Sequence, residues 1–207
     1  MNFYNLKHKE EQLNFKEATI KGQGKDKGLF FPEDISKFSN EFLQNLPNLS
    51  NEEIAFQVMK DFVGDEIPEA ELRKIVAETI AFDIPLKKVT ENISVLELFH
   101  GPTLAFKDVG ARFMSRCLGY FLKNETRKVT VLVATSGDTG GAVANGFYDV
   151  EGIEVVILYP KNRVSPVQEK QLTALGKNIH ALEVNGSFDD CQALVKQAFS
   201  DESLNEK

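Results

Sequence analysis

The sequence predicts an α/β fold with a parallel sheet, preceded by a small α-rich amino-terminal domain. Two observations predict it. From about residue 84, short β-branched apolar runs alternate with amphipathic segments of helical period, which is the pattern of successive βαβ units. Before that point, apolar residues recur mainly at helical spacing. We therefore expect an amino-terminal domain at residues 1–82 and an α/β domain at residues 83–207.

The amino-terminal domain is expected to begin with short extended segments and to continue as three helices. Gly22, Gly24 and Gly28 interrupt the first part of the chain, which indicates brief segments there. Ser50 and Glu53 have the spacing of a capping box. The expected elements are two or three extended segments within residues 15–31, then helices at residues 36–46, 50–63 and 68–81, the last with Pro68 in its first turn.

The second domain is expected to alternate between strands and helices. Residues 128–134 are short, nearly all apolar and β-branched, as in a strand buried on both faces of a parallel sheet. In residues 108–123 an apolar residue recurs at every fourth position, which gives one apolar helix face. The expected strands are residues 93–99, 128–134, 153–159 and 179–184, and the expected helices are residues 108–123, 139–149, 165–176 and 188–200.

Lys107 is the candidate catalytic residue. It follows the apolar residues Leu104 and Phe106, shortly after a Gly-Pro turn, at the expected start of a helix. Desolvation in such a setting lowers the pKa of a lysine and exposes its neutral form, which Schiff-base chemistry with a carbonyl cofactor requires. From the residues alone, a purely structural lysine is the alternative. Asp108 is expected to cap the helix rather than to act in catalysis.

The segment Ser136-Gly137-Asp138-Thr139-Gly140 lies between an expected strand and an expected helix. Free N–H groups at a helix amino terminus, together with the helix dipole, attract anions. The glycines let the backbone approach a ligand closely, and the two hydroxyl groups add donors. The segment therefore predicts an anion-binding loop. An ordinary glycine-rich turn, with Asp138 or Thr139 as the helix cap, is the alternative.

Lys107 and segment 136–140 together resemble the pyridoxal-phosphate enzymes of the tryptophan-synthase β fold (fold type II), and specifically the threonine synthase family. In that family a lysine in a Pro-Thr-x-x-Phe-Lys-Asp setting carries the cofactor, and a downstream Ser-Gly-Asp-Thr-Gly loop grips the substrate's α-carboxylate. Segments 22–32 and 158–170 resemble the same family, so four motifs occur in its order between about residues 2 and 200. The resemblance implies a carbon–oxygen lyase acting on phosphate, which converts O-phospho-L-homoserine and water to L-threonine and phosphate.

The resemblance also implies roles for individual residues. Lys107 carries pyridoxal 5'-phosphate and moves protons, Phe106 packs beside the cofactor, and Asp138 points toward the cofactor's 3'-oxygen or bonds loop N–H groups. The expected contacts of the α-carboxylate are Ser136, Gly137, Thr139 and Gly140. The leaving phosphate requires cations or oriented donors, and the candidates are Lys161, Arg163, Ser165 and Thr103, with a solvated basic loop as the alternative for residues 161–165.

The sequence departs from the family in its length. Threonine synthases are considerably longer, and the glycine-rich loop that holds the cofactor phosphate has no counterpart within residues 1–207. We therefore expect this chain to be the amino-terminal part of such an enzyme, with an incomplete catalytic domain that is inactive alone. Whether a shortened chain or a split gene accounts for the length stays open.

Other functions remain as alternatives. A related lyase acting on phosphothreonine, or a dehydratase acting on free threonine or serine, would use the same cofactor. An inactive fragment that serves in structure or assembly is a second alternative. A nucleotide-binding protein with segment 136–140 as its phosphate loop is a third, but the segment lacks the Gly-Lys-Ser/Thr ending of a Walker loop.

The composition excludes several other classes. A net charge of -7 argues against nucleic acid or an anionic membrane as partner. No apolar run approaches the length that spans a bilayer, and residues 1–7 contain no apolar signal core. Cys117 and Cys191 have no metal spacing and suit a reducing cytoplasm. We expect a cytoplasmic enzyme with a small-molecule substrate and no metal, while the sequence leaves the oligomeric state open.

Overall fold

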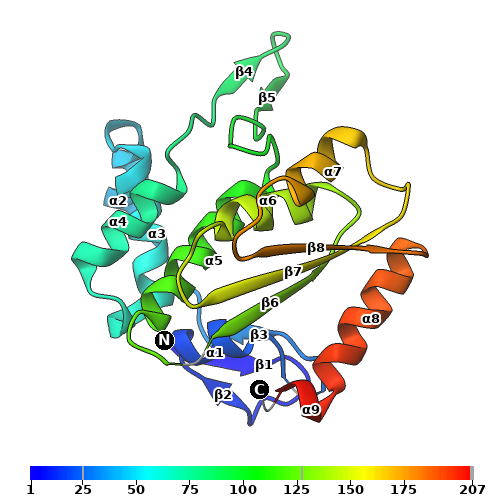
Figure 1. Ribbon diagram of the computed structural model, residues 1–207. Helices are drawn as coiled ribbons and strands as arrows, with labels where there is room; N and C mark the ends of the chain where they lie inside the picture. Colours follow the sequence, from blue (N-terminus) through cyan, green and yellow to red (C-terminus); the bar gives the residue numbers. More distant parts are fainter. Residues whose placement is uncertain (25, 127, 206–207) are drawn as a thin grey trace. The chain divides into compact units, whose positions relative to one another are not determined.

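A computed structural model describes residues 1–24, 26–126 and 128–205. The described residues form two compact units, Met1–Ala81 and a second unit that begins at Phe82 (Figure 1). Each unit is described by itself below. Lys25, which belongs to the segment 22–32 noted above, lies outside the described residues.

The amino-terminal unit combines helices with a small antiparallel sheet. Among its described residues the strands pair in the order β2-β1-β3, with Phe3 opposite Leu13 on one side and Pro32 on the other. The strands are β1 (Phe3–Asn5), β2 (Gln12–Leu13) and β3 (Phe30–Pro32). The helices are α1 (Phe15–Lys21), α2 (Asn40–Asn45), α3 (Asn51–Val63) and α4 (Glu69–Thr79), with 3-10 turns η1 (Leu46–Asn48) and η2 (Gly64–Glu66).

The expectation of two or three short extended segments within residues 15–31 is wrong for the first part of that range, because residues 15–21 form α1. Asn14 accepts a hydrogen bond from the Glu17 backbone nitrogen at 2.8 Å, and the Glu17 carboxylate accepts one from the Asn14 nitrogen at 3.1 Å. This capping box starts a helix of only seven residues. Its apolar residues are too few to reveal helical periodicity, and the glycines that follow it indicate broken, extended segments instead.

The three helices expected in this unit are present, with one shortened at its start. Ser39 accepts from the Phe42 nitrogen at 3.1 Å and begins α2 later than expected. Ser50 accepts from the Glu53 nitrogen at 3.1 Å, as the capping box predicts. The Glu53 side chain departs from that motif, because its carboxylate accepts hydrogen bonds from Gln57 and Arg73, each at 2.7 Å. The cap therefore has one of its two reciprocal bonds, and Glu53 instead joins α3 to α4.

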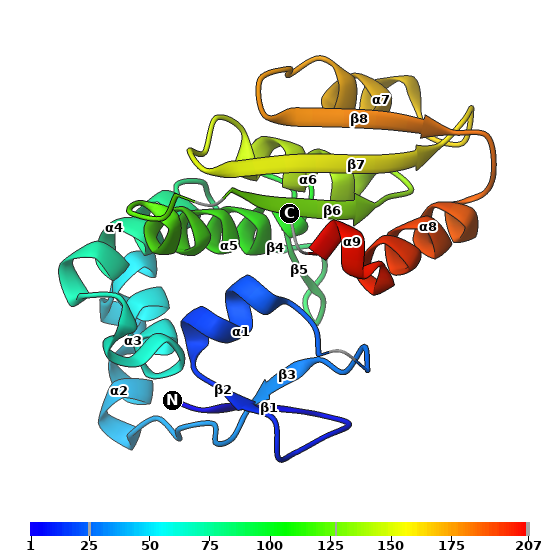
Figure 2. The ribbon, with the colours of Figure 1, turned by 60° about the horizontal axis from the view of Figure 1, so that its bottom comes forward.

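The second unit contains the parallel sheet that the sequence predicts. In the described part of the chain, β6, β7 and β8 pair in that order and run parallel, with β7 in the middle (Figures 1 and 2). Val131 lies opposite Val155, and Val155 lies opposite Ile179. The strands are β6 (Val129–Ala134), β7 (Ile153–Pro160) and β8 (Ile179–Val184). The helices are α5 (Lys107–Leu122), α6 (Asp138–Phe147), α7 (Pro166–Thr173), α8 (Phe188–Ser200) and α9 (Glu202–Asn205).

The core of this unit lies between β7 and the helices around it. All residues of β7 except Glu154 and Val156 are buried, and this strand packs with apolar side chains from α5, α6 and α7. Full burial of one such side chain contributes about 1.5–3 kcal/mol. The central members are Leu118, Phe147, Ile153, Val155, Ile157 and Leu172. The apolar helix faces and apolar strand runs that predict these elements therefore also locate the core.

Two expectations for the sheet are wrong. Residues 93–99 form only a short strand, β5 (Ser94–Leu96), which pairs antiparallel with β4 (Leu86–Lys88) in a separate hairpin. Figure 1 shows this hairpin projecting away from the parallel sheet. In addition, β6 is half-buried rather than buried on both faces, because it pairs with β7 along one edge and lies at the edge of the described sheet. Apolar, β-branched content indicates a strand but does not specify its partner.

Candidate active site

The carboxyl ends of the parallel strands bring two predicted loops to one edge of the sheet. β6 ends at Ala134 and continues into segment 136–140, while β7 ends at Pro160 and continues into the loop with Lys161 and Arg163. Since Ala134 pairs with Leu158 in the parallel register, both loops leave the sheet at the same edge. Ligands bind at this edge in open α/β sheets.

Thr135, which the sequence analysis did not select, organises segment 136–140. Its side chain is 1% exposed, and its Oγ1 atom accepts hydrogen bonds from the backbone nitrogens of Gly137 at 3.0 Å and Gly140 at 2.8 Å. The hydroxyl also donates to the Gly137 carbonyl at 3.2 Å. These two N–H groups are therefore used inside the loop. The first-turn N–H groups of Asp138 and Thr139 have no acceptor within the helix and face the same end of α6.

The glycines of this loop are required by packing within the protein. Gly137 has φ +144°, and a Cβ there would lie 2.5 Å from the side-chain amide of Gln168. A Cβ at Gly140 would lie 2.5 Å from the Cγ2 of Thr135 and 2.8 Å from a methyl of Leu172. The sequence interpretation assigned these glycines to close approach of a ligand. The structure gives them an additional reason, which is the close approach of Thr135 and of α7.

Asp138 is the first residue of α6, and its side chain contacts α7. Its Oδ1 atom accepts a hydrogen bond from Gln168 Nε2 at 2.5 Å. The family resemblance implies that this carboxylate points toward the cofactor or bonds loop N–H groups. The second of these expectations is wrong for the described structure, because the hydrogen-bond partner is a side chain 30 residues further along the chain. A role of Asp138 at the cofactor stays a prediction.

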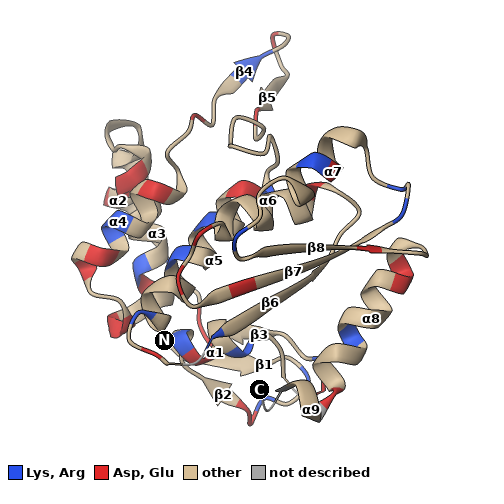
Figure 3. Ribbon diagram, viewed as in Figure 1, with Lys and Arg blue, Asp and Glu red and all other residues tan. Residues whose placement is uncertain are grey.

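The loop between β7 and α7 holds the candidate phosphate contacts, and its basic positions are visible in Figure 3. Lys161 Nζ is paired with Glu183 at 3.0 Å. Ser165 caps α7, because its Oγ atom accepts from the Gln168 nitrogen at 3.3 Å and donates to Gln168 Oε1 at 2.9 Å. Arg163 is exposed, and its guanidinium has no partner within the described residues. Within the described structure, Arg163 is therefore the phosphate candidate in this loop whose side chain is not already paired.

Lys107 begins α5, as predicted, but its surroundings differ from the prediction. Its side chain is exposed, and the neighbouring Leu104 and Phe106 are 70% and 64% exposed. The expected desolvation of the amine is therefore absent from the described structure. The apolar neighbours that suggested burial instead form an exposed surface beside the amine. Exposure leaves the Lys107 amine accessible to a ligand.

Asp108 is buried beneath the loop that precedes Lys107. Its carboxylate accepts hydrogen bonds from the Thr103 hydroxyl at 2.5 Å, the Thr103 nitrogen at 3.0 Å and the Ala105 nitrogen at 3.4 Å. A Cβ at Gly101 would clash with this carboxylate. The expectation that Asp108 caps the helix is wrong, because Phe106 is the N-cap residue of α5 and the Asp108 carboxylate instead binds Thr103 and Ala105 in the preceding loop. The Thr103 hydroxyl, a candidate substrate contact, is engaged by Asp108 in this structure.

Helix α7 connects the two predicted motifs. Gln168 donates to Asp138 of the 136–140 loop, and Gln171, one turn later, donates to the Thr103 carbonyl at 3.4 Å. Gln168 lies within segment 158–170, which resembles the family, but the local sequence indicates no role for either glutamine. Their contacts join the Lys107 loop and the 136–140 loop to one helix.

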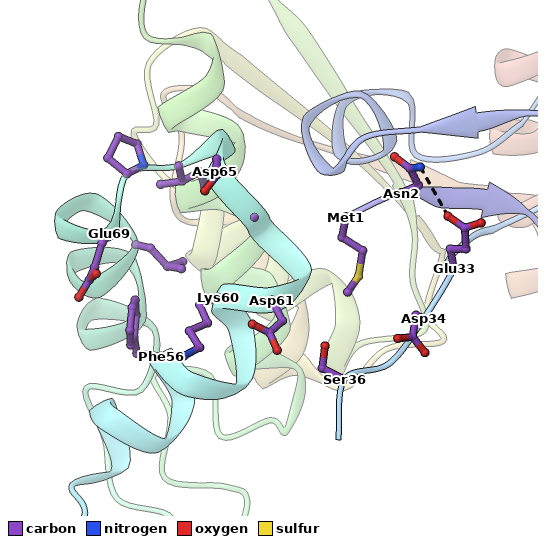
Figure 4. Close-up of a pocket in the computed structure, with 14 residues that line it drawn as sticks. Met1, Asn2, Glu33, Asp34, Ser36, Phe56, Lys60, Asp61, Asp65 and Glu69 are labelled. Atoms are coloured by element: carbon purple, nitrogen blue, oxygen red, sulfur yellow. Dashed lines mark hydrogen bonds between the residues drawn. The ribbon is translucent and has the colours of Figure 1, made fainter. Parts of the chain in front are cut away.

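A hollow of about 900 Å³ lies elsewhere, within the amino-terminal unit (Figure 4). It is lined by residues of the β1 and β3 region and of α3 and α4, and Figure 4 shows carboxylates from both. The charged lining residues are Glu33, Asp34, Lys60, Asp61, Asp65 and Glu69. None of the predicted site residues belongs to it. Within the described ranges, no group of three or more His, Cys, Asp and Glu side chains could hold a metal ion.

The cysteines are buried and unreactive in character. Burial raises the pKa of the Cys117 thiol to about 12, and burial also raises the pKa of Cys191. Because the thiolate is the nucleophile, neither cysteine is a candidate for covalent catalysis. In the part of the chain that the structure describes, the helices fall short of the length and apolar character needed to cross a membrane.

Comparison with protein families gives two matches that together cover nearly the whole chain. Residues 2–80 match the model described as "Threonine synthase N terminus". Residues 82–205 match the model described as "Pyridoxal-phosphate dependent enzyme". The matches agree with the family resemblance stated from the motifs.

Individual proteins give the same result. The chain is 50% identical over 206 residues to threonine synthase of Haemophilus influenzae, which covers 100% of the chain and 48% of that protein. It is 47% identical over 204 residues to threonine synthase of Escherichia coli, with 99% and 47% covered. The chain therefore spans about half the length of the curated relatives that it matches.

Solved structures are similar over the same range. The crystal structure of threonine synthase from Escherichia coli matches with a TM-score of 0.91 and 47% identity, covering 99% of this chain and 47% of that one. The structure titled as PLP-bound threonine synthase from Brucella melitensis matches with a TM-score of 0.89 and 40% identity, covering 98% and 45%. The parallel sheet and its helices are thus those of the fold type II enzymes.

Proposed function

Because the chain belongs to the family of pyridoxal-phosphate dependent enzymes, whose model matches residues 82–205, we propose that it supplies part of the active site of a threonine synthase. The reaction is the conversion of O-phospho-L-homoserine and water to L-threonine and phosphate. The observation that carries the proposal is the pair of loops that α7 joins, one with an exposed lysine and one at a helix amino terminus. The matches to curated threonine synthases support this choice of reaction.

The described residues fit the cofactor at one of its anchoring points. An aldehyde requires an accessible primary amine, and the exposed amine of Lys107 at the start of α5 supplies one. The exposed ring of Phe106 lies next to it in the chain and offers an apolar surface for the cofactor ring. When bound, pyridoxal phosphate withdraws electrons from the carbon atoms of the amino-acid substrate. In this proposal Lys107 holds the cofactor and moves protons at those carbon atoms.

The 136–140 loop is proposed to bind the substrate's α-carboxylate. The hydroxyl groups of Ser136 and Thr139 and the first-turn N–H groups of α6 are the donors, and the helix dipole favours an anion there. Gly137 and Gly140 contribute by allowing the loop to take its shape, since their own N–H groups donate to Thr135. The loop therefore orients the substrate and leaves proton transfer to Lys107.

The leaving phosphate is proposed to contact Arg163. A guanidinium offers a planar fork that matches two phosphate oxygens. Lys161 is less suited, because Glu183 already occupies its amine, and the hydroxyl groups of Ser165 and Thr103 are engaged by Gln168 and Asp108. We also propose a reducing compartment such as the cytoplasm, which the free thiols of Cys117 and Cys191 support.

The test is an assay of the natural protein that contains this chain, supplied with O-phospho-L-homoserine and pyridoxal phosphate. We expect equal amounts of threonine and phosphate. Release of phosphate with a keto acid in place of threonine would indicate a related lyase and contradict the proposal. Borohydride reduction followed by peptide mapping should label Lys107.

A matched control separates loss of chemistry from loss of folding. Lys107→Ala should abolish threonine formation and the borohydride label, while Lys123→Ala, at an exposed position after the other end of α5, should preserve both. The unfolding temperature of Lys107→Ala should stay close to that of the unaltered apoprotein, because the exposed amine makes little contribution to packing. Label at another lysine in the unaltered protein would refute the assignment.

A further inference from the structure

We propose that Gln168 is a positioning residue that holds the Asp138 carboxylate away from the donors of the 136–140 loop, so that these donors stay available to the substrate's α-carboxylate. The inference rests on the proposed function for the identity of the ligand at this loop. It concerns a residue of segment 158–170 for which the sequence predicts no role, on the helix that follows the next strand.

The contact between the two side chains is short and charge-assisted. Gln168 Nε2 donates to Asp138 Oδ1 at 2.5 Å. Hydrogen bonds to an ionised acceptor are shorter than neutral ones and contribute roughly twice as much. Although Asp138 is exposed, Gln168 is half-buried, so the amide is held while the carboxylate faces solvent.

The orientation of the Gln168 amide is fixed from its other side. Its Oε1 atom accepts from the Ser165 nitrogen at 3.2 Å and from the Ser165 hydroxyl at 2.9 Å. An N–H group must meet an acceptor, so the amide oxygen faces Ser165 and the amide nitrogen faces Asp138. The capping box of α7 thereby determines which group Asp138 meets.

Gly137 makes room for this contact. A Cβ at Gly137 would lie 2.5 Å from the carbon and nitrogen of the Gln168 amide, which is closer than such atoms approach. The backbone at Gly137 also has φ +144°, a region that glycine tolerates and other residues rarely adopt. Loop and glutamine therefore fit together only with glycine at this position.

The contact matters because an acidic residue begins the helix that is proposed to bind an anion. A carboxylate in a first turn is attracted to the free N–H groups there and can occupy them itself. It would also repel an incoming carboxylate. Thr135 accepts hydrogen bonds from two of the loop N–H groups, so these are not available to Asp138. Gln168 holds the Asp138 oxygen toward α7. The remaining donors are left for the substrate.

The experiment is a double-mutant cycle in the natural protein that contains this chain. Gln168→Glu preserves the size of the side chain and the acceptor for Ser165, but places a second carboxylate against Asp138. In the Asp138→Asn background the same change places a carboxylate against an amide, which can donate to it. The effect of Gln168→Glu should therefore depend on the residue at position 138.

The readouts are KM and kcat for O-phospho-L-homoserine and the dissociation constant of L-threonine, measured by calorimetry. L-Threonine carries the α-carboxylate without the phosphate, so its binding does not depend on the proposed phosphate contacts. With Asp138 present, Gln168→Glu should raise KM and the dissociation constant about tenfold and change kcat less than threefold. In the Asp138→Asn background, the same change should raise both constants less than twofold relative to Asp138→Asn itself.

Two further variants make the result specific. Gln171→Glu adds the same charge one turn later and should have equal effects in both backgrounds. Gln168→Met, a neutral change of similar size, gives a second cycle if the glutamate variant folds poorly, and it should also depend on Asp138. Equal effects of each Gln168 change in both backgrounds would overturn the positioning role. Unaltered protein that makes no threonine would instead overturn the proposed function, and with it the ligand assigned to the loop.

Discussion

The Oγ1 atom of Thr135 lies 2.8 Å from the backbone nitrogen of Gly140, five residues further along the chain. Because the same atom also accepts from Gly137, one buried hydroxyl satisfies two backbone donors where β6 passes into α6. The loop is consequently held from beneath, by a side chain that is almost completely inaccessible to solvent. This arrangement leads to the first prediction.

Thr135→Val should lower the free energy of unfolding by about 2–4 kcal/mol. Valine has the shape of threonine, but it leaves two N–H groups without a partner, each costing about 1–3 kcal/mol. Urea denaturation of the natural protein would measure this loss. Thr135→Ser is the control, because it retains the hydroxyl and should lose less than half as much. Equal stability of the two variants would contradict the role given to the hydroxyl.

Two glycine-to-alanine changes are expected to alter the stability of the protein in opposite directions. Gly110→Ala lies on the exposed side of α5, where an added Cβ meets nothing within 4 Å, and it should stabilise the protein by about 0.5–1 kcal/mol. Gly137→Ala should destabilise it by about 1–3 kcal/mol, because φ is +144° and Gln168 occupies the space. Thermal unfolding compares the two. A stabilising Gly137→Ala would show that the loop does not require its present shape.

Arg163→Ala should raise KM for O-phospho-L-homoserine by roughly tenfold or more, since a hydrogen bond to a charged group contributes about 1.5–3 kcal/mol. Lys161→Ala should raise it less, because that amine is already paired with Glu183 at 3.0 Å. Cofactor affinity should change little in either variant. The measurement is steady-state kinetics on the natural protein. An unchanged KM in Arg163→Ala would leave the loop as a solvated surface.

Glu53 should make stability depend on pH at the acidic end. Hydrogen bonds from Gln57 and then from Arg73 hold the pKa of this carboxyl below its usual value of 4.5. A depressed pKa contributes stability that is fully present above about pH 4.5 and is lost as the pH falls through the folded-state pKa. The difference in unfolding temperature between the unaltered protein and Glu53→Gln should therefore shrink from neutral pH to about pH 3.

The control for this prediction is Glu52→Gln, which changes an exposed carboxylate in the same turn of α3. Its difference from the unaltered protein should vary less over the same range. A Glu53→Gln difference that is constant with pH would show that the hydrogen bonds do not favour the ionised form.

The parallel sheet and its helices could be predicted because their signals are local and strong. The apolar runs ending at Ala134 and Tyr159 identify strands, and the apolar residue at every fourth position of 108–123 identifies α5. By contrast, α1 has too few apolar residues to show a period, and the strand at Ser94–Leu96 gives no sign that its partner is Leu86–Lys88. Local patterns predict elements more readily than they predict partners.

Parts of the candidate site could likewise be predicted from the sequence, and other parts could not. Lys107 and Ser136–Gly140 carry recognisable motifs, and their positions at helix starts could be predicted from the sequence. The exposure of Lys107 could not, because apolar neighbours in the sequence do not determine which surfaces a fold covers. Gln168 and Gln171 could not either, since each acts on a residue at least 30 positions earlier in the chain.

The one-turn separation of Gln168 and Gln171 constrains how this protein can change in evolution. Each residue added to an α-helix rotates all later side chains by about 100°. An insertion or deletion between the two glutamines would therefore turn one away from its target while the other stayed in place. Related proteins should tolerate varied side chains on the exposed positions of α7, yet keep the same number of residues from Ser165 to Gln171. We therefore expect the length of this segment to vary less among related proteins than the identity of its exposed residues.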